Sequence, residues 1–92
     1  MLFFLFDFIK RYFINIYFMK LIKKKIIDVV SKCTKTDPKN IAENTSTENL
    51  QAWDSLAHVR IMVELKDLTG INIPTSDFGN FNSVSSILKK FT

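Results

Sequence analysis

The sequence predicts an all-α fold: a small four-helix bundle of three main helices and one short helix, with a long loop between helices 1 and 2. In three separate segments, apolar residues recur at spacings of three and four, as they do on the buried side of an amphipathic helix. No segment shows the alternation of apolar and polar residues that marks a half-buried strand.

The chain has 92 residues, the length of one domain. A domain this short buries only about 60% of its unfolded surface, so it has little room for a deep active-site cleft. Cys33 is the single cysteine, which excludes an internal disulfide and a zinc site built on cysteines. A reducing, cytoplasmic location fits this content, and we expect Cys33 to be a small buried apolar residue.

Residues 1–18 differ in composition from the rest and hold six of the nine phenylalanines. A transmembrane helix needs about 20 apolar residues, whereas Asp7, Lys10 and Arg11 interrupt this segment. It also lacks the features of a signal peptide. Three interpretations stay open: translation starts at Met19, the segment is a membrane-surface helix, or it packs on the domain or a partner. If residues 1–18 are translated, we expect them to form a helix that continues into the helix that follows.

The first helix of the bundle is predicted over residues 19–34, with helical spacing of its apolar positions: Leu21, Ile22, Ile26, Val29, Val30 and Cys33. Residues 34–54 lack this period and are rich in Asn, Ser and Thr. They predict a structured loop held by three isolated apolar side chains, those of Ile41, Leu50 and Trp53. A loop of this length is uncommon in a compact domain and is often functional.

The second helix is predicted over residues 54–69. Asp54 is its expected N-cap, accepting a hydrogen bond from the N–H of Leu56 or Ala57, and Gly70 is its expected stop. An extended link follows over residues 71–74. Residues 75–80 predict one short helical turn with Phe78 facing inward.

The last helix is predicted to start at an Asn82 cap and to run through Phe91. One face of this helix carries its apolar residues, which are Val84, Ile87, Leu88 and Phe91.

The second helix has apolar residues on two sides, although a surface helix needs only one buried stripe. We assign one side to the core: Ile61, Met62, Leu65 and Leu68. The other side is then predicted to bind partners through Leu56, Val59, Arg60, Val63 and Lys66. The alternative is that a small bundle buries both sides partly.

The net charge of +4 arises mainly from a lysine run at residues 20 and 23–25. A solvated helix face explains such a run better than a nucleic-acid groove, so we expect no nucleic-acid partner. The chain has one histidine, no cluster with metal-ligand spacing and no glycine-rich phosphate loop. Ser55 and His58 lack a third member for a nucleophilic triad. We therefore expect no enzyme, no catalytic residue and no metal, and we expect His58 to be an exposed side chain.

Ser55 falls in the first turn of the second helix, where its hydroxyl would be exposed. The unpaired N–H groups of a helix start and the helix dipole place partial positive charge there, and a phosphate on Ser55 would be stabilised by it. His58, one turn further, could contact such a phosphate. The alternative is that Ser55 is only a capping residue.

The order of these features resembles the acyl and peptidyl carrier protein family over about residues 20–91. In that family an Asp-Ser-Leu motif, here Asp54-Ser55-Leu56, opens the second helix, and a Gly-x-x-(Ile/Val)-Pro segment, here residues 70–74, follows it. The resemblance implies that a phosphopantetheinyl transferase moves 4'-phosphopantetheine from coenzyme A to Ser55, with Asp54 orienting this magnesium-dependent reaction. The arm would hold an acyl or aminoacyl group as a thioester. The resemblance divides the chain into a hydrophobic extension, residues 1–18, and an acyl-carrier-like domain, residues 19–92.

The sequence departs from the family at three positions. Trp53 stands where a small residue commonly precedes the Asp, and Arg60 and Lys66 stand where fatty-acid-synthesis carriers present acidic residues. These departures favour a specialised pathway over housekeeping fatty-acid synthesis. Residues 73–78 are also similar to D-alanyl carrier proteins, which is the alternative assignment.

The partners that the resemblance implies are the transferase, a loading ligase for acyl or aminoacyl groups, and an acyltransferase or synthase, with the carrier a monomer. From other classes, the rivals are an unmodified helical interaction module at a membrane and a small nucleic-acid binder. Membrane contact is expected only if residues 1–18 are made.

Overall fold

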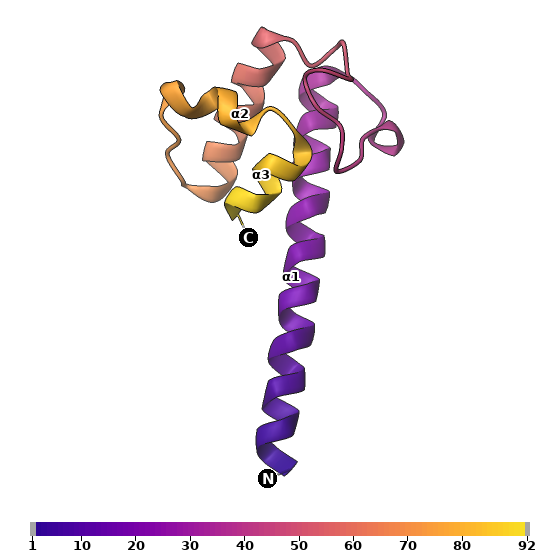
Figure 1. The fold of residues 1–92 in the computed structure, drawn as a ribbon, viewed down its shortest axis with the longest axis vertical. Helices are drawn as coiled ribbons and strands as arrows, with labels where there is room; N and C mark the ends of the chain where they lie inside the picture. Colours follow the sequence, from indigo (N-terminus) through magenta and orange to yellow (C-terminus); the bar gives the residue numbers. More distant parts are fainter. Residues whose placement is uncertain (1, 92) are drawn as a thin grey trace.

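The chain folds into helices, and residues 2–91, which the structure describes, contain no β-strand (Figure 1). The structure is a computed structural model; it describes the backbone of residues 2–91 and the side chains of residue 10 and residues 16–91. The elements are α1 (Leu2–Thr34), η1 (Pro38–Asn40), α2 (Ser55–Thr69), η2 (Thr75–Phe81) and α3 (Val84–Phe91). The predicted all-α fold is confirmed, with η2 as its short helix. The sequence did not indicate η1, a single 3₁₀ turn inside the long loop.

Helix α1 has 33 residues, and only its second half packs against α2 and α3, while the first half projects away from the bundle (Figure 1). The expected helix over residues 19–34 is thus the end of a longer helix that the extension continues. α1 ends where Lys35 adopts a left-handed conformation, with φ 53°. The N–H of Thr36 then donates to the carbonyl of Ser31 at 3.1 Å, which is the bond of a Schellman motif.

Both predicted ends of α2 are confirmed. The Asp54 carboxylate caps the helix, since its Oδ1 accepts a hydrogen bond from the N–H of Ala57 at 2.9 Å. At the other end, Gly70 has φ 71° and donates its N–H to the carbonyl of Lys66 at 2.7 Å. A left-handed residue at this position is far less costly for glycine than for a residue with a Cβ.

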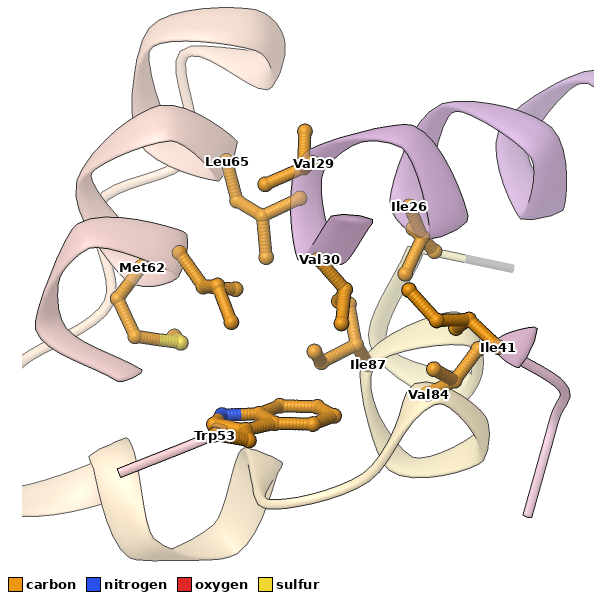
Figure 2. Packing of buried hydrophobic residues seen from close by; sticks show 10 residues of the cluster. Ile26, Val29, Val30, Ile41, Trp53, Met62, Leu65, Val84 and Ile87 are labelled. Atoms are coloured by element: carbon orange, nitrogen blue, oxygen red, sulfur yellow. The ribbon is translucent and has the colours of Figure 1, made fainter. Parts of the chain in front are cut away.

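The core lies where α1, α2, α3 and the long loop meet (Figure 2). Trp53, 2% exposed, is the largest of the fully buried side chains, and its ring lies across the ends of side chains that come from all three helices (Figure 2). Ile41 is buried, and Leu50 is half-buried against the core. The prediction that these three apolar residues hold the long loop is confirmed.

Backbone hydrogen bonds also tie the long loop to the start of α3. The N–H of Thr47 donates to the carbonyl of Asn82, and the N–H of Val84 donates to the carbonyl of Thr45, both at 3.0 Å. These bonds bring distant segments together and set where α3 can begin.

The cap of α3 is Ser83, and the prediction of Asn82 was wrong by one residue. The Ser83 Oγ accepts from the N–H of Ser86, and the Ser86 Oγ accepts from the N–H of Ser83, each at 3.1 Å. This reciprocal pair is a capping box. The backbone carbonyl of Asn82 instead accepts a hydrogen bond from the N–H of Thr47 in the long loop. The predicted apolar face of α3 is confirmed: Val84 and Ile87 are buried, and Leu88 and Phe91 pack against the core.

Three predicted core positions lie at its edge instead. Leu68 shares the register of Ile61 but is 51% exposed, and in the last turn of α2 it lines an open groove with Leu21 and Phe91. Leu21, 50% exposed, lies where α1 leaves the bundle. Cys33 is half-buried rather than buried.

Candidate functional site

The candidate site is the loop-to-helix junction at Ser55. Trp53 is buried in the core and Asp54 caps α2, so the residues on the N-terminal side of Ser55 are fixed in place. Ser55 itself is exposed at the first position of α2. The alternative that Ser55 is the capping residue is wrong, since the Asp54 carboxylate makes the capping hydrogen bond.

The electrostatics at this junction favour an anion. The N–H groups of Ser55 and Leu56 belong to the first turn of α2, which has no preceding carbonyls to accept them. The partial positive charge at a helix start stabilises a negative group by about 0.3–1 kcal/mol at an exposed position. The Asp54 carboxylate directs one oxygen, Oδ1, to the N–H of Ala57, so part of its charge is compensated.

An open hollow of about 420 Å³ lies beside Ser55. One wall comes from the start of α2 and the residues before it, and the other comes from η2 and the segment before α3. Its lining residues are Thr47, Trp53, Asp54, Ser55, His58, Gly79 and Asn82. A group attached to the Ser55 hydroxyl would have this shallow space next to it.

His58 bridges the two walls of the hollow. Its Nδ1 accepts a hydrogen bond from the indole N–H of Trp53 at 3.0 Å, and its Nε2 lies 2.7 Å from the carbonyl oxygen of Phe78. The indole nitrogen can only donate, so Nδ1 must be unprotonated and Nε2–H donates to the carbonyl. The imidazole that makes both bonds is therefore neutral. We call this arrangement the Trp53–His58–Phe78 bridge.

The bridge corrects the expectation that His58 is an exposed helix side chain, because the residue is half-buried with both ring nitrogens engaged. In this state His58 has no nitrogen left to contact a phosphate or to act as a base for Ser55. Sequence spacing could not reveal it, since one of the two partners is a backbone carbonyl 20 residues away.

The predicted partner-binding side of α2 is exposed along its length. Leu56, Val59 and Val63 are 62%, 48% and 51% exposed, and Arg60 and Lys66 are exposed beside them. We call the three apolar residues the exposed stripe.

A groove of about 260 Å³ runs between this side of α2 and the end of α1. An ion pair between the Lys32 Nζ and the Glu64 Oε1, 3.2 Å apart, joins the two helices there. Among the side chains that the structure describes, those of residue 10 and residues 16–91, no three His, Cys, Asp or Glu side chains lie where they could hold a metal ion.

Comparison with known proteins identifies the family. A family model described as a phosphopantetheine attachment site matches residues 24–90. The chain belongs to this family. It is a carrier domain rather than an enzyme, and its prosthetic group is 4'-phosphopantetheine, as the sequence predicted.

The carrier domain is also similar to part of a much larger protein. It is 27% identical over 66 residues to the non-reducing polyketide synthase Dhc5 of Alternaria cinerariae, a match that covers 72% of this chain and 3% of that synthase. The carrier thus corresponds to a small portion of that relative.

Proposed function

We propose that Ser55 carries the 4'-phosphopantetheine and presents its thiol to partner enzymes that load, exchange or use an acyl or aminoacyl group. The observation that carries this proposal is an exposed serine hydroxyl at the first position of a capped helix, beside an open hollow. A phosphopantetheinyl transferase would join the Ser55 Oγ to the phosphate of the arm, with loss of the hydroxyl proton and of the nucleotide part of coenzyme A. The arm then supplies the thiol that forms the thioester.

The residues around Ser55 have supporting roles in this proposal. The first N–H groups of α2 stabilise the negative charge of the phosphodiester. Asp54 caps α2 through one oxygen, and its other oxygen orients the magnesium-dependent transfer. The Trp53–His58–Phe78 bridge holds the two walls of the hollow at a fixed separation.

The partner surface that we propose consists of the exposed stripe with two cations beside it. Leu56, Val59 and Val63 provide apolar contact area next to Ser55, and Arg60 and Lys66 favour partners with acidic surfaces. Enzymes that dock acidic carriers through basic patches would be repelled. A specialised biosynthetic pathway in the cytoplasm accommodates this charge, and similarity to a polyketide synthase supports it.

The domain boundary that we propose is residue 19. The family match begins at residue 24, and the first described core contacts come from Ile22 and Ile26. Residues 1–18 would then be an extension that the carrier function itself does not need.

Intact-mass spectrometry after incubation with coenzyme A and a broad-specificity phosphopantetheinyl transferase tests the proposal. The chain should gain the mass of one phosphopantetheine, and Ser55→Ala should gain none while keeping its helical circular dichroism. Ser76→Ala, which removes another exposed hydroxyl in η2, should be modified like the wild type. A wild-type chain that stays at its unmodified mass, or a Ser55→Ala variant that still gains the arm, would refute it.

A further inference from the structure

The N-terminal part of α1, residues 2–19, is here called the stalk, and most of it projects from the bundle (Figure 1). At its base, Phe18 also lines a groove with Leu68 and Phe91 of the bundle. The last four residues of the stalk, Ile16, Tyr17, Phe18 and Met19, are 37%, 79%, 55% and 47% exposed. Successive positions on an α-helix are about 100° apart, so these four side chains surround the helix axis. The base of the stalk is therefore apolar on every side and exposed to water, which is costly for a free protein.

The rest of the stalk sequence is also largely apolar. In the sequence, Asp7, Lys10, Arg11 and Asn15 follow one another at spacings of three, one and four, a pattern typical of the polar side of an amphipathic helix. Such a helix lies in the interface of a membrane rather than across it, and α1 is not long and apolar enough to span one over the residues described.

A group of lysines follows the apolar segment directly. Lys20, Lys24 and Lys25, here called the lysine collar, are exposed on the first turns of α1 at the bundle. Lys23 belongs to the same run but pairs with the carboxylate of Glu43 at 3.1 Å. Each lysine close to an anionic membrane surface strengthens binding about fivefold, and an apolar helix with an adjacent basic cluster supplies the two signals that stable anchoring takes.

A second copy of the chain is a poorer occupant of the stalk. Two helices that pair through a seam cover one apolar stripe on each, whereas the four exposed positions at the base of the stalk point in four directions. A seam would leave about half of them in water. A membrane interface instead takes up the wide apolar side of the helix and also attracts the lysines that follow it.

We propose that the stalk and the lysine collar bind the surface of a membrane that contains anionic phospholipids. The antiparallel packing of α1 and α2 makes this compatible with access to the start of α2: Leu21 and Leu68 share a groove near the stalk, whereas Lys32 and Val59 share a groove at the other end. Residues 20–33 of α1 separate the two ends by about 20 Å. The inference does not depend on which residue carries the arm.

Co-sedimentation of the full chain with vesicles tests this inference. One vesicle type is phosphatidylcholine alone and the other an equimolar mixture with phosphatidylglycerol. Binding should favour the anionic vesicles and fall as salt is added. Tyr17→Glu should weaken binding to both by about tenfold, whereas Leu56→Glu, at another exposed apolar position but at the other end of the bundle, should not.

The lysine collar is tested by a matched pair of charge reversals. Lys20→Glu/Lys24→Glu should weaken binding to the anionic vesicles by at least about tenfold, while Lys35→Glu/Lys39→Glu, which makes the same change in charge at the far end of α1, should leave it within about twofold. The inference is overturned if the full chain stays in solution with both vesicle types, or if the two reversals have equal effects. A stable dimer by light scattering that loses its partner on Tyr17→Glu would overturn it as well, by assigning the stalk to a second copy.

Discussion

The two sides of α2 have similar apolar side chains but opposite surroundings. Ile61 is fully buried, at 0% exposed, and Val63, two residues later, is 51% exposed. The buried side packs against α1 and belongs to the core, and its residues are Ala57, Ile61, Met62 and Leu65. The other side is the exposed stripe, which begins at Leu56, next to Ser55 at the start of α2.

This difference shows that hydropathy alone does not set burial in a small bundle. Among the elements described, α2 contacts α1 and η2, which cover one side of it and leave the other side without a helix. β-branched and leucine side chains on an uncovered helix face, next to the serine that we propose to carry the arm, leave apolar contact area open to the partner that we propose. Four experiments would break or sharpen this comparison.

Truncating one side chain on each side of α2 should give the largest difference in the free energy of unfolding. Ile61→Ala is expected to lower the free energy of unfolding by about 2–5 kcal/mol, because it leaves a cavity in the core. Val63→Ala is expected to change it by less than about 0.5 kcal/mol, since the side chain is half in water. Urea denaturation followed by circular dichroism measures both. Equal losses for the two variants would contradict the burial described here.

His58 lies on the same helix and is half-buried, but it contributes hydrogen bonds rather than apolar contacts. His58→Ala removes the acceptor for the buried Trp53 indole and the donor to the Phe78 carbonyl, so we expect a loss of about 1–3 kcal/mol. The emission of Trp53, the single tryptophan, should shift to longer wavelength as water reaches the ring. His58→Gln, which restores an amide donor and acceptor, should recover part of the loss. Unchanged stability and emission in His58→Ala would show that the bridge does not hold the junction.

The exposed stripe should matter for transfer and not for folding. Val59→Glu and Val63→Glu are each expected to lower kcat/KM of the partner enzyme by about tenfold, as loss of a central apolar contact does at an interface, with little change in stability. Leu68→Glu is the control, because Leu68 is equally exposed on α2 but lies at the opposite end, beside the stalk. If Leu68→Glu slows transfer as much as Val63→Glu, the exposed stripe is not the docking surface.

The smallest expected effect concerns Cys33, which lines the groove beside the exposed stripe. Burial raises the pKa of its thiol above the ordinary value of 9.0, and the negative charge of Glu64 adds to this, while Lys32 and Arg60 oppose it. A raised pKa means less thiolate at neutral pH, so iodoacetamide should modify Cys33 more slowly than a free cysteine peptide. The rate should rise as the pH passes 9.0.

Glu64→Gln sharpens that measurement. Loss of the negative charge lowers the pKa of the Cys33 thiol, so alkylation at a fixed neutral pH should be about twofold to threefold faster than in the wild type. Intact-mass spectrometry follows both reactions. A Cys33 that reacts as fast as the free peptide at neutral pH would contradict the half-buried position.

Several parts of the fold could be predicted from the sequence because their signals are local. The Asp54 cap, the Gly70 stop and the apolar period of the helices depend on residues within one or two turns. The three apolar anchors of the loop were also visible, since isolated large apolar residues in a polar stretch have few places to go other than the core. The same local pattern placed Ser55 at a helix start with an exposed hydroxyl.

Tertiary structure alone decided the remaining features, because each depends on a segment distant in the chain. Leu68 is exposed because it lies at the open rim of the bundle, in a groove that it shares with Leu21 and Phe91. Ser83 rather than Asn82 caps α3, because the Asn82 carbonyl accepts a hydrogen bond from Thr47 in the long loop. His58 became part of the site only when folding brought the Phe78 carbonyl to it. Local sequence thus determined both ends of α2, whereas the packing of distant segments determined where α3 begins and which helix faces are covered, since burial is a property of neighbours that a helix does not itself encode.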